Sequence, residues 1–403
     1  MVKREYDLVI AGAGVIGLAT AIAAKLTLGA QARILICDPG RSTQRQSIQA
    51  YAISSGPKIL LQKIGVWGKI ARVQPVRRME ITDSDLEDVV RQTYLNFDSS
   101  ADPSRSLAEM VSHNDLIMSL EETAAVAGIT IRDVTITGFD ATPKSVSICL
   151  NGDEIITAGL LASCDGAESQ IRALAKIPVV GWAYDRQAIV ATVSAENDHG
   201  GIAVQHFLPA GTFALLPRAG NQFSVVWVEK PKSATALCRL PRAEFENELQ
   251  IRAGNTFGKL ELREGPATFP LRLQIARRFT GPRLVLMGDA AHTMHPLAGQ
   301  GLNLGLRDIG FLMSHLEKQA RLGLDLGQLE SLKDYERSRR RDTVRMLALT
   351  DALFRIFTTG ASPARTLRDF ALGLVDQLPV LKSTLVEHAA GDRENSPRLL
   401  RVG

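Results

Sequence analysis

The sequence predicts an α/β protein: a Rossmann-like nucleotide-binding domain with an inserted, mostly antiparallel β-sheet domain and a helical segment near the C-terminus. Three observations predict this fold. An apolar strand, a glycine turn, an alanine-rich helix and a second strand open the chain within residues 8–37, as in a βαβ unit. Residues 181–269 change to short alternating segments separated by turns. Residues 283–287 return to a buried, parallel-type strand, so the first domain is expected to be discontinuous.

The length and the charge of the chain limit its class. Its 403 residues are more than one hydrophobic core usually organises, so two or three domains are expected. The 47 basic and 43 acidic residues leave a net charge of only +4, which argues against a nucleic-acid partner. The four cysteines are scattered, and His292 and His295 lack further ligands nearby, so we expect reduced thiols and no metal site.

The sequence gives no sign of export or of a membrane span. The N-terminus leads directly into the first strand, without the apolar stretch of a signal peptide. No segment reaches the roughly 18 uncharged apolar residues of a spanning helix. We therefore expect a cytoplasmic protein whose contact with a membrane, if it has one, is peripheral.

Local patterns predict the remaining elements. Helices are expected at residues 54–64 and 113–127 and from about residue 302. Asn151-Gly152, which tolerates positive φ, predicts a hairpin turn between strands. Strands of the second domain are expected at residues 188–193, 212–216 and 222–228. The expected division assigns residues 1–70, 109–180 and 276–340 to the nucleotide-binding domain, residues 71–108 and 181–275 to the inserted domain, and residues 341–403 to the helical region.

The first candidate binding motif follows the opening strand. Gly12, Gly14 and Gly17 fit G-x-G-x-x-G between a strand and a helix, where glycines permit a tight turn and let a pyrophosphate approach the helix N-terminus. Asp38 ends the second strand, where a carboxylate accepts hydrogen bonds from an adenosine ribose. A glycine turn alone can serve packing, so the strand, the helix and Asp38 together indicate a dinucleotide. Both FAD and NAD fit this motif.

A second motif, GDAAHTMHPLAGQGLN, lies far downstream at residues 288–303. A strand ends at Gly288, and Asp289 presents a carboxylate that can bind sugar or ribityl hydroxyls. Gly299 and Gly301 let the backbone approach a flat ring, and the following helix directs its N-terminal dipole at that ring. Such a site stabilises negative charge on a reduced flavin, so this motif favours FAD.

With these motifs in place, the sequence resembles the class A flavoprotein hydroxylases, and among them the ubiquinone-biosynthesis hydroxylases of the 2-polyprenylphenol type. The resemblance covers nearly the whole chain and rests on three motifs in the family's order: residues 12–17, Asp165-Gly166 and residues 288–303. It implies the fold of the glutathione-reductase and para-hydroxybenzoate-hydroxylase type. The FAD-binding residues that it implies are Gly12, Gly14, Gly17, Asp38, Asn114, Asp165, Gly166, Gly288, Asp289, Gly299, Gly301, Leu302 and Asn303, and the catalytic residues are His295 and Pro296.

The resemblance also implies a role for the main positions. Asp289 is implied to hold the ribityl chain of FAD, and Asp165 to lie near the pyrophosphate and the approach of NAD(P)H. The segment from Gly301 to Asn303 is implied to contact the isoalloxazine. Pro296 is implied to lie near the reactive face of the ring.

The implied chemistry belongs chiefly to the cofactor. NAD(P)H, a transient reductant, reduces FAD, O₂ adds at C4a, and the flavin hydroperoxide hydroxylates the aromatic ring of a polyprenylated phenol in ubiquinone biosynthesis. The substrate would come from the membrane, and a quinone-biosynthesis protein complex could be a further partner. Three alternatives stay open: a hydroxylase of a small soluble phenol, a flavin-binding scaffold subunit of a quinone-biosynthesis complex, and an FAD oxidoreductase that saturates prenyl chains.

The sequence departs from the family pattern at Gln49. Relatives usually carry an arginine there, before Ala-x-Ala-Leu, whereas this chain has Gln49 followed by Ala-Tyr-Ala-Ile. A glutamine cannot supply a cation to the pyrophosphate. Arg41 or Arg45, in the preceding loop, could supply this cation instead. If neither does, the affinity for FAD or the mobility of the flavin would differ from that in the relatives.

Three further patterns have more than one interpretation. Arg337, Arg339, Arg340 and Arg341 alternate with acidic residues, which favours a solvated helix face over a lipid-binding surface. Residues 346–386 carry apolar side chains that could pack on the flavin domain, dock a partner or lie on a membrane. Apolar residues of the second domain could line a substrate pocket or form its core; they are Leu208, Pro209, Phe213, Leu215, Leu216, Pro217 and Trp227.

Overall fold

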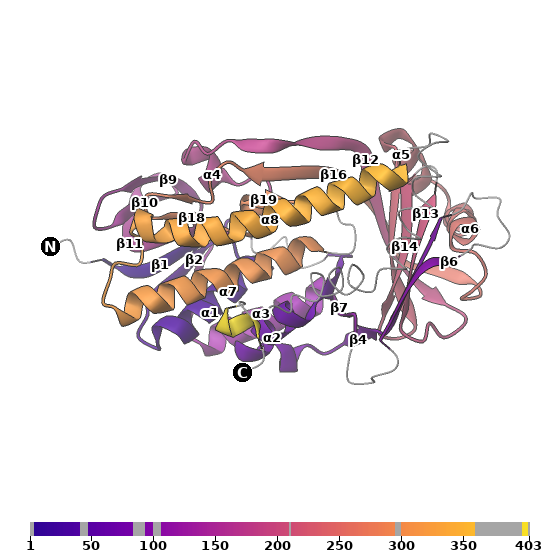
Figure 1. The fold of residues 1–403 in the computed structure, drawn as a ribbon, viewed down its shortest axis with the longest axis horizontal. Coiled ribbons are helices and arrows are strands. Elements are labelled where there is room, and N and C mark those ends of the chain that lie inside the picture. Colours follow the sequence, from indigo (N-terminus) through magenta and orange to yellow (C-terminus); the bar gives the residue numbers. More distant parts are fainter. Residues whose placement is uncertain are drawn as a thin grey trace.

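The computed structural model describes residues 4–40, 47–83, 93–99, 106–208, 211–294, 300–358 and 397–401. This part of the chain is elongated, with a sheet near each end and long helices and strands running between them (Figure 1). The sheet that contains the N-terminal strand is called the first sheet, and the sheet at the other end is called the second sheet. A small three-stranded sheet lies between them along the chain's path.

The first sheet has the parallel centre of a nucleotide-binding fold. Its strand order is β17-β18-β11-β1-β2-β8, and β10 and β9 extend from β11. The pairs from β18 through β11, β1 and β2 to β8 are parallel, and their buried apolar side chains are typical of strands covered on both faces. The strands are β1 (Tyr6–Ala11), β2 (Ile34–Cys37), β8 (Thr130–Arg132), β9 (Ile136–Ala141), β10 (Val146–Leu150), β11 (Glu154–Ser163), β17 (Thr280–Gly281) and β18 (Leu284–Leu286).

Three helices accompany the first sheet, and α1 (Val15–Leu28) contacts both α3 (His113–Val126) and α7 (Gln300–Arg321) (Figure 1). α1 is buried along most of its length because its glycine and alanines allow close approach to its neighbours. α3 begins where the Ser112 side chain accepts a hydrogen bond from the Asp115 N–H at 3.0 Å. The short helices are α2 (Ser55–Lys63), η1 (Trp67–Lys69), α4 (Gln170–Leu174), η2 (Gly288–Ala290) and η4 (Arg398–Leu400).

The second sheet is mostly antiparallel, in the order β19-β16-β12-β15-β14-β13-β5-β6, and only β13 and β5 pair in parallel. Helices α5 (Pro231–Cys238) and α6 (Arg242–Ala253) supply Ala234, Phe245 and Leu249 to a core on one face of it. The strands are β5 (Arg78–Asp83), β6 (Thr93–Asp98), β12 (Val179–Ala195), β13 (Ile202–Leu208), β14 (Gly211–Arg218), β15 (Gln222–Glu229), β16 (Leu260–Ala276) and β19 (His292–Thr293).

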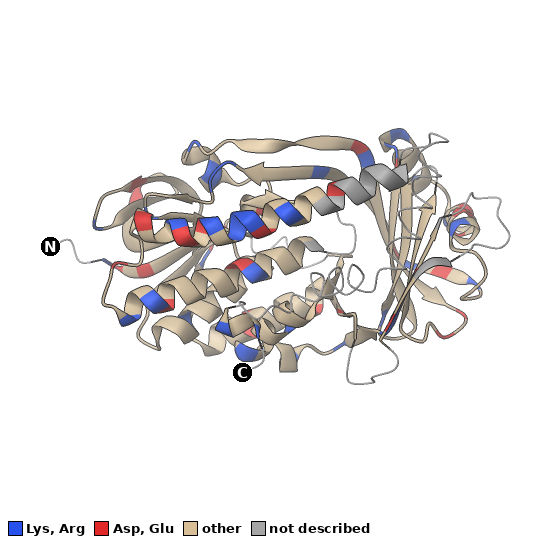
Figure 2. Cartoon of the chain, in the orientation of Figure 1, with Lys and Arg blue, Asp and Glu red and all other residues tan. Residues whose placement is uncertain are grey.

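Long elements connect the two ends of the molecule. β12 and β16 pair from end to end, with an interruption between Ala183 and Gln187, and form a ribbon that reaches from the second sheet back over the first part of the fold (Figure 1). α8 (Leu329–Thr358) runs alongside this ribbon and carries alternating basic and acidic residues over its first half (Figure 2). The intervening small sheet has the order β3-β7-β4, with β3 (Ala50–Ile53), β4 (Val73–Val76) and β7 (Ala108–Ser112). None of the helices within the described ranges is long and apolar enough to cross a membrane.

The fold confirms the predicted class and most of the predicted elements. The expected opening strands and helix are β1, α1 and β2, and the expected strand at residues 283–287 is β18, parallel to β11. The expected hairpin joins β10 and β11, and both Asn151 and Gly152 have positive φ. The patterns did not predict α5 and α6, which close the second core.

Candidate functional site

The glycine motif lies where the strand order of the first sheet changes direction. β1 is flanked by β2 on one side and by β11 on the other, and ligands of such sheets bind at the carboxyl ends of these strands. A Cβ on Gly12 would lie 2.5 Å from the carbonyl oxygen of Cys164, directly after β11. A Cβ on Gly17 would lie 1.9 Å from the Gly12 carbonyl oxygen, so both positions require glycine for backbone packing.

Gly14 has a different environment. A Cβ there would meet no atom within 4 Å, and Gly14 lines a cavity at the N-terminus of α1. The first N–H groups of a helix have no partners within the helix, and its dipole favours an anion. Open space and free donors at this turn therefore fit a pyrophosphate.

Asp38 holds the glycine turn against β2. Its buried carboxylate accepts hydrogen bonds from the N–H of Ala13 at 2.5 Å and of Gly40 at 2.7 Å. The side chain thus lies at the end of β2 next to the turn, where an acidic residue can also meet a ribose.

The second motif opens into the same cavity, which Gly288, Asp289, Gly301 and Leu302 line. The Asp289 side chain is accessible to solvent through the cavity, yet protein atoms surround it closely. This desolvation raises the pKa of Asp289, an effect that His292 opposes and Asp308 increases. Hydroxyl donors of a bound ribityl chain would stabilise such a carboxylate.

A buried ionic network around Asp308 holds the Gly288–Asp289 turn in place. Asp308 accepts hydrogen bonds from the Gly288 N–H at 2.9 Å and from Arg339 Nε at 2.6 Å, and it lies 2.8 Å from His292 Nε2. Arg339 also donates to Asp342 Oδ2 at 2.7 Å. Burial favours a raised pKa for Asp308, but the charges of His292 and Arg339 hold the pKa below its usual range.

The expectation of a solvated arginine face on α8 is wrong for Arg339. Arg337 and Arg341 are exposed, whereas the Arg339 side chain is completely buried, as is most of Tyr335 one turn earlier. The 3.6-residue period puts residues 335 and 339 on one face of the helix. The sequence signal that could have found the network is Asp308, a lone acid within the apolar part of α7.

Asn303 joins the start of α7 to the neighbouring elements. Its Oδ1 accepts from the N–H of Ser54 at 3.0 Å, and its Nδ2 donates to the Ala52 carbonyl at 2.7 Å. The side chain is buried, so it positions the N-terminal turn of α7, while Gly301 and Leu302 are the members of the predicted segment that line the cavity.

The cavity extends from these loops to the second sheet. Its volume of about 460 Å³ is that of a small-molecule site. The second sheet contributes a mainly apolar wall, made of Ala188, Val190, Leu216, Ser224, Val226, Phe269, Pro270 and Leu271. One cavity therefore joins the polar glycine turns to an apolar surface.

Of the apolar residues considered for a pocket, Leu216 lines the cavity. Phe213, Leu215, Trp227 and Leu208 instead belong to the core against α5 and α6. The side chains of adjacent residues in a strand point to opposite faces of the sheet, so Leu215 enters the core and Leu216 faces the cavity. The sequence could not show which face meets the cavity, because both faces are apolar. Pro217 is not among the cavity residues, and Pro209 lies outside the described residues.

Gln49 takes part in a polar group on the cavity wall. The Tyr51 hydroxyl donates to Gln49 Oε1 at 3.3 Å and lies 2.8 Å from His113 Nδ1, and all three residues line the cavity. Burial raises the pKa of Tyr51, and the nearby Asp289 carboxylate adds to the shift. The hydroxyl is therefore protonated, and the group offers hydrogen bonds where the family pattern has a cation.

Asp165 and Asn114 serve local structure in the described chain. The Asp165 carboxylate accepts from Ser163 Oγ at 2.5 Å, from Ser169 Oγ at 2.7 Å and from the Ile171 N–H at 3.1 Å. The Asn114 side chain accepts from the Ser47 N–H at 3.1 Å and is not among the residues described as lining the cavity. Gly166, beside Asp165, does line it.

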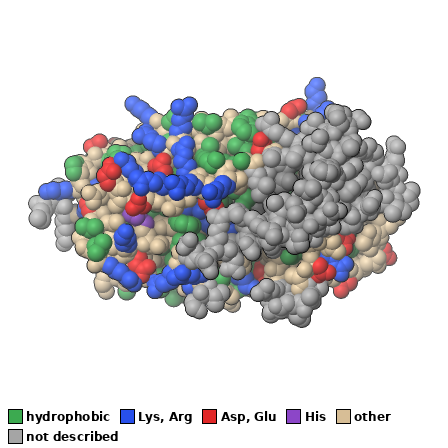
Figure 3. Space-filling model, viewed as in Figure 1, with side chains coloured by type: hydrophobic (Ala, Val, Ile, Leu, Met, Phe, Trp, Pro, Cys, Tyr) green, Lys and Arg blue, Asp and Glu red, His purple; other side chains and the backbone are tan. Residues whose placement is uncertain are grey.

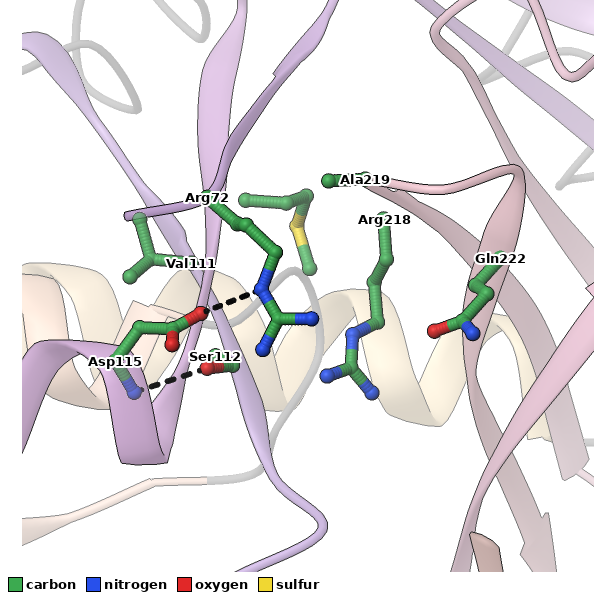
Figure 4. Close-up of a pocket in the computed structure, with 8 residues that line it drawn as sticks. Arg72, Val111, Ser112, Asp115, Arg218, Ala219 and Gln222 are labelled. Carbon is green, nitrogen blue, oxygen red and sulfur yellow. Dashed lines mark hydrogen bonds and ion pairs between the residues drawn. The ribbon is translucent and has the colours of Figure 1, made fainter. Parts of the chain in front are cut away.

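A smaller cavity lies next to Arg218 of β14 and Gln222 of β15 (Figure 4). Each of these residues is two positions along its strand from a residue of the main cavity, Leu216 and Ser224. Arg72 Nε lies 3.5 Å from an Asp115 carboxylate oxygen, and Arg218 donates to Thr192 Oγ1 at 2.6 Å. Burial lowers the pKa of Arg218; Glu264 opposes this shift and Arg72 adds to it. The apolar wall thus ends in a charged group.

Several predicted residues lie outside the described part of the chain. These are the two catalytic candidates His295 and Pro296, the glycine Gly299, and the two loop arginines Arg41 and Arg45. Their predicted roles stay predictions.

Comparison with known proteins identifies the relatives of the chain. The FAD binding domain family matches residues 5–350. Ubiquinone hydroxylase UbiL of Rhodospirillum rubrum is 34% identical over 411 residues, covering 99% of this chain and 93% of that protein. The 3-demethoxyubiquinol 3-hydroxylase of Escherichia coli is 30% identical, covering 97% of this chain and 100% of that protein.

The fold also matches a solved structure. The p-nitrophenol 4-monooxygenase PnpA of Pseudomonas putida superposes with a TM-score of 0.79 at 18% identity, covering 97% of this chain and 100% of that one. The sequence matches confirm the resemblance to FAD-dependent hydroxylases, and with it FAD as the cofactor. The structural match confirms the architecture.

Proposed function

Because the chain belongs to the FAD binding domain family, we propose that it is an FAD-dependent monooxygenase that hydroxylates the aromatic ring of a polyprenylated phenol in ubiquinone biosynthesis. The single observation that carries the proposal is the shared cavity: its walls are the glycine turns and Asp289 on one side and the apolar face of the second sheet on the other. A flavin and an apolar substrate would meet there.

The residues of the first sheet fit FAD. Gly14 leaves open space at the N-terminus of α1 for the pyrophosphate, and Asp38, at the end of β2 beside this turn, would meet the ribose. Asp289 would accept hydrogen bonds from the ribityl hydroxyls, and the backbone at Gly301 and Leu302 would face the ring. When bound, FAD supplies the activation of O₂ with electrons from NAD(P)H.

The chain's own residues would bind, orient and shield the substrate. The apolar wall, with small side chains at Ala188 and Ser224, leaves room for a hydrocarbon chain and excludes water from the ring. Tyr51 and His113 offer hydrogen bonds to a phenolic hydroxyl at the polar end of the cavity. We propose that His295 and Pro296 lie near the reacting ring and that the enzyme works in the cytoplasm, at the inner membrane face.

The test is the quinone profile of cells that lack the gene, measured by lipid extraction and mass spectrometry after growth in air. We expect a prenylated phenol that lacks one ring hydroxyl to accumulate, and wild-type protein to restore the quinone. Asp289→Ala should fail to restore it, because the cofactor loses its ribityl partner, while Asp140→Ala, on the exposed surface of β9, should restore it.

Other results would favour the other functions. An unchanged quinone profile together with turnover of simple hydroxybenzoates would indicate a hydroxylase of soluble phenols. Restoration by an Asp289→Ala protein that lacks bound FAD would indicate a scaffold subunit. Turnover without O₂ would indicate an oxidoreductase of prenyl chains.

A further inference from the structure

Three apolar side chains, two of β12 and one of α8, are exposed where the ribbon of β12 and β16 lies alongside α8 (Figure 1). Val180 and Trp182 of β12 are 47% and 42% exposed, and Val344 of α8 is 47% exposed. β12 pairs with β15 only from Gln187 onward, so over the described residues its first part has β16 on one side and a free edge on the other. Proteins usually protect such an edge with charges or cover it.

Two contacts fix α8 next to this part of the ribbon. Near one end of the patch, the Arg340 guanidinium donates to the carbonyl of Arg277, which pairs with the start of β12. Near the other end, the Tyr184 hydroxyl donates to Asp351 Oδ1 at 2.7 Å. Val180 and Trp182 lie between these two contacts on β12 and Val344 lies between them on α8, and the three side chains together are called the exposed apolar patch.

Several exposed cations lie on the elements of this surface or directly next to them in the chain. Each of five exposed side chains makes no ion pair with another described residue: Lys176, Arg277, Arg278, Arg341 and Arg345. On the face shown in Figure 3, hydrophobic side chains lie beside Lys and Arg side chains above and along α8.

The acidic side chains of the same elements are mostly paired already. Glu168 binds Arg272, Asp334 binds Arg337 and Glu336 lies 4.0 Å from Arg340. Asp342 binds Arg339 inside the protein. Asp185 is left as an exposed carboxylate on β12, and Asp351 of α8 accepts from the Tyr184 hydroxyl, so the five cations outnumber these two carboxylates around the patch.

We propose that this surface docks the protein on an anionic lipid bilayer, with Trp182, Val180 and Val344 in the interface and the five cations against the headgroups. Tryptophan favours the boundary between water and hydrocarbon, and each Lys or Arg near an anionic surface strengthens binding. Docking goes beyond the proposed reaction, since it would bring the enzyme to a membrane-borne substrate whatever ring carbon is attacked.

The test uses the full-length FAD-loaded protein with phosphatidylcholine vesicles that contain phosphatidylglycerol, and with phosphatidylcholine vesicles as the comparison. We expect sedimentation with the anionic vesicles, weakened by salt. Arg341→Gln with Arg345→Gln should weaken binding roughly 30-fold, from two lost headgroup interactions. The matched control is Lys232→Gln of α5 with Arg239→Gln directly after this helix, two exposed cations next to the second sheet, and it should bind within about twofold of wild type.

Trp182 provides a second, independent readout. On vesicle binding its fluorescence should shift to the blue and be quenched by brominated lipid, and Trp182→Phe should remove that signal while most binding persists. Absence of binding to anionic vesicles at low salt, equal weakening by the control pair, or no change in Trp182 emission would overturn the proposal. Turnover of a detergent-dispersed prenylated phenol should be normal in Arg341→Gln with Arg345→Gln, so loss of docking is distinguishable from loss of the reaction.

Discussion

Replacing Arg339 by methionine should destabilise the protein strongly, because it leaves a buried carboxylate without its cation. The Arg339 and Asp308 side chains are both completely buried, with 2.6 Å between Arg339 Nε and Asp308 Oδ1. Arg339 also binds Asp342 Oδ2 at 2.7 Å. Methionine keeps much of the volume and removes both interactions.

The size of the effect follows from burial. Removing one partner of a buried ion pair typically costs about 3–5 kcal/mol, because the remaining charge stays desolvated. His292 Nε2, at 2.8 Å from Asp308, and the Gly288 N–H, at 2.9 Å, remain as hydrogen-bond partners of the carboxylate. We therefore expect a loss near the lower end, about 3 kcal/mol, in the free energy of unfolding.

The assay is urea unfolding of the apoprotein, followed by near-ultraviolet circular dichroism. The matched control is Arg337→Met on the same helix, where the ion pair to Asp334 is exposed, and it should change stability by less than about 1 kcal/mol. Because Asp308 also accepts from the Gly288 N–H, Arg339→Met should weaken FAD binding as well. Equal, small effects of the two substitutions would refute the assignment of Arg339 to a buried network.

Three further predictions concern the cofactor turn, an ion pair and the cavity wall. Gly14→Ala should fold normally but bind FAD about tenfold or more weakly, because its methyl group enters the open space that the phosphate needs. Gly17→Ala should instead lower the free energy of unfolding by at least about 2 kcal/mol, because its methyl group collides with backbone. FAD titration measures the first effect and urea unfolding the second. Burial favours a raised pKa for Asp325, but the hydrogen bond from Arg283 and other donors lower it to about 2, so the stability it contributes is present above its unfolded pKa and is lost as pH falls towards 2. Asp325→Asn should cost about 1 kcal/mol at neutral pH, because the group is partly exposed, and less at pH 3, measured by unfolding at both pH values. Ser224→Phe should reduce kcat/KM for a long-chain phenol more than for a short one, and because Ser224 is buried it should also cost about 1–3 kcal/mol of stability.

Each of these predictions has a comparison that would contradict it. Gly68→Ala, also with open space around its Cβ but away from the cavity, should leave FAD binding unchanged, and equal weakening would sink the phosphate argument. A stability difference for Asp325→Asn that stays constant with pH would contradict the lowered pKa. Leu215→Ala, on the other face of the sheet, should cost about 2–5 kcal/mol without a preference for chain length.

The cofactor side of the site was largely predictable because its constraints are local in sequence. A Cβ on Gly17 would collide with the carbonyl of Gly12, five residues earlier, whereas a Cβ on Gly12 would collide with Cys164, which follows the neighbouring strand β11. Such collisions depend on the turn between β1 and α1, which the G-x-G-x-x-G spacing specifies. Gly288 and Asp289 follow a buried strand in the same manner, and the structure brings both motifs to one cavity.

The substrate side was not predictable in the same way. Leu215 and Leu216 are chemically identical, and only the packing of α5 and α6 decides that Leu215 enters the core while Leu216 lines the cavity. Likewise Arg337 and Arg339 share one local pattern, and Asp308, a residue of another helix, decides which of them is buried. Contacts between distant segments carry this information.

The position of Gln49 shows how the two kinds of information combine. The sequence has Gln49 where relatives usually have an arginine, and the loss of this cation by itself argues for weak FAD binding. The structure adds that Gln49, Tyr51 and His113 form one hydrogen-bonded group on the cavity wall, and that Asp289 lies close enough to raise the pKa of Tyr51. Gln49 and the protonated Tyr51 carry no charge, so they leave the carboxylate of Asp289 available to hydroxyl donors of the cofactor. The departure at Gln49 is therefore compatible with FAD binding through hydrogen bonds in place of an ion pair.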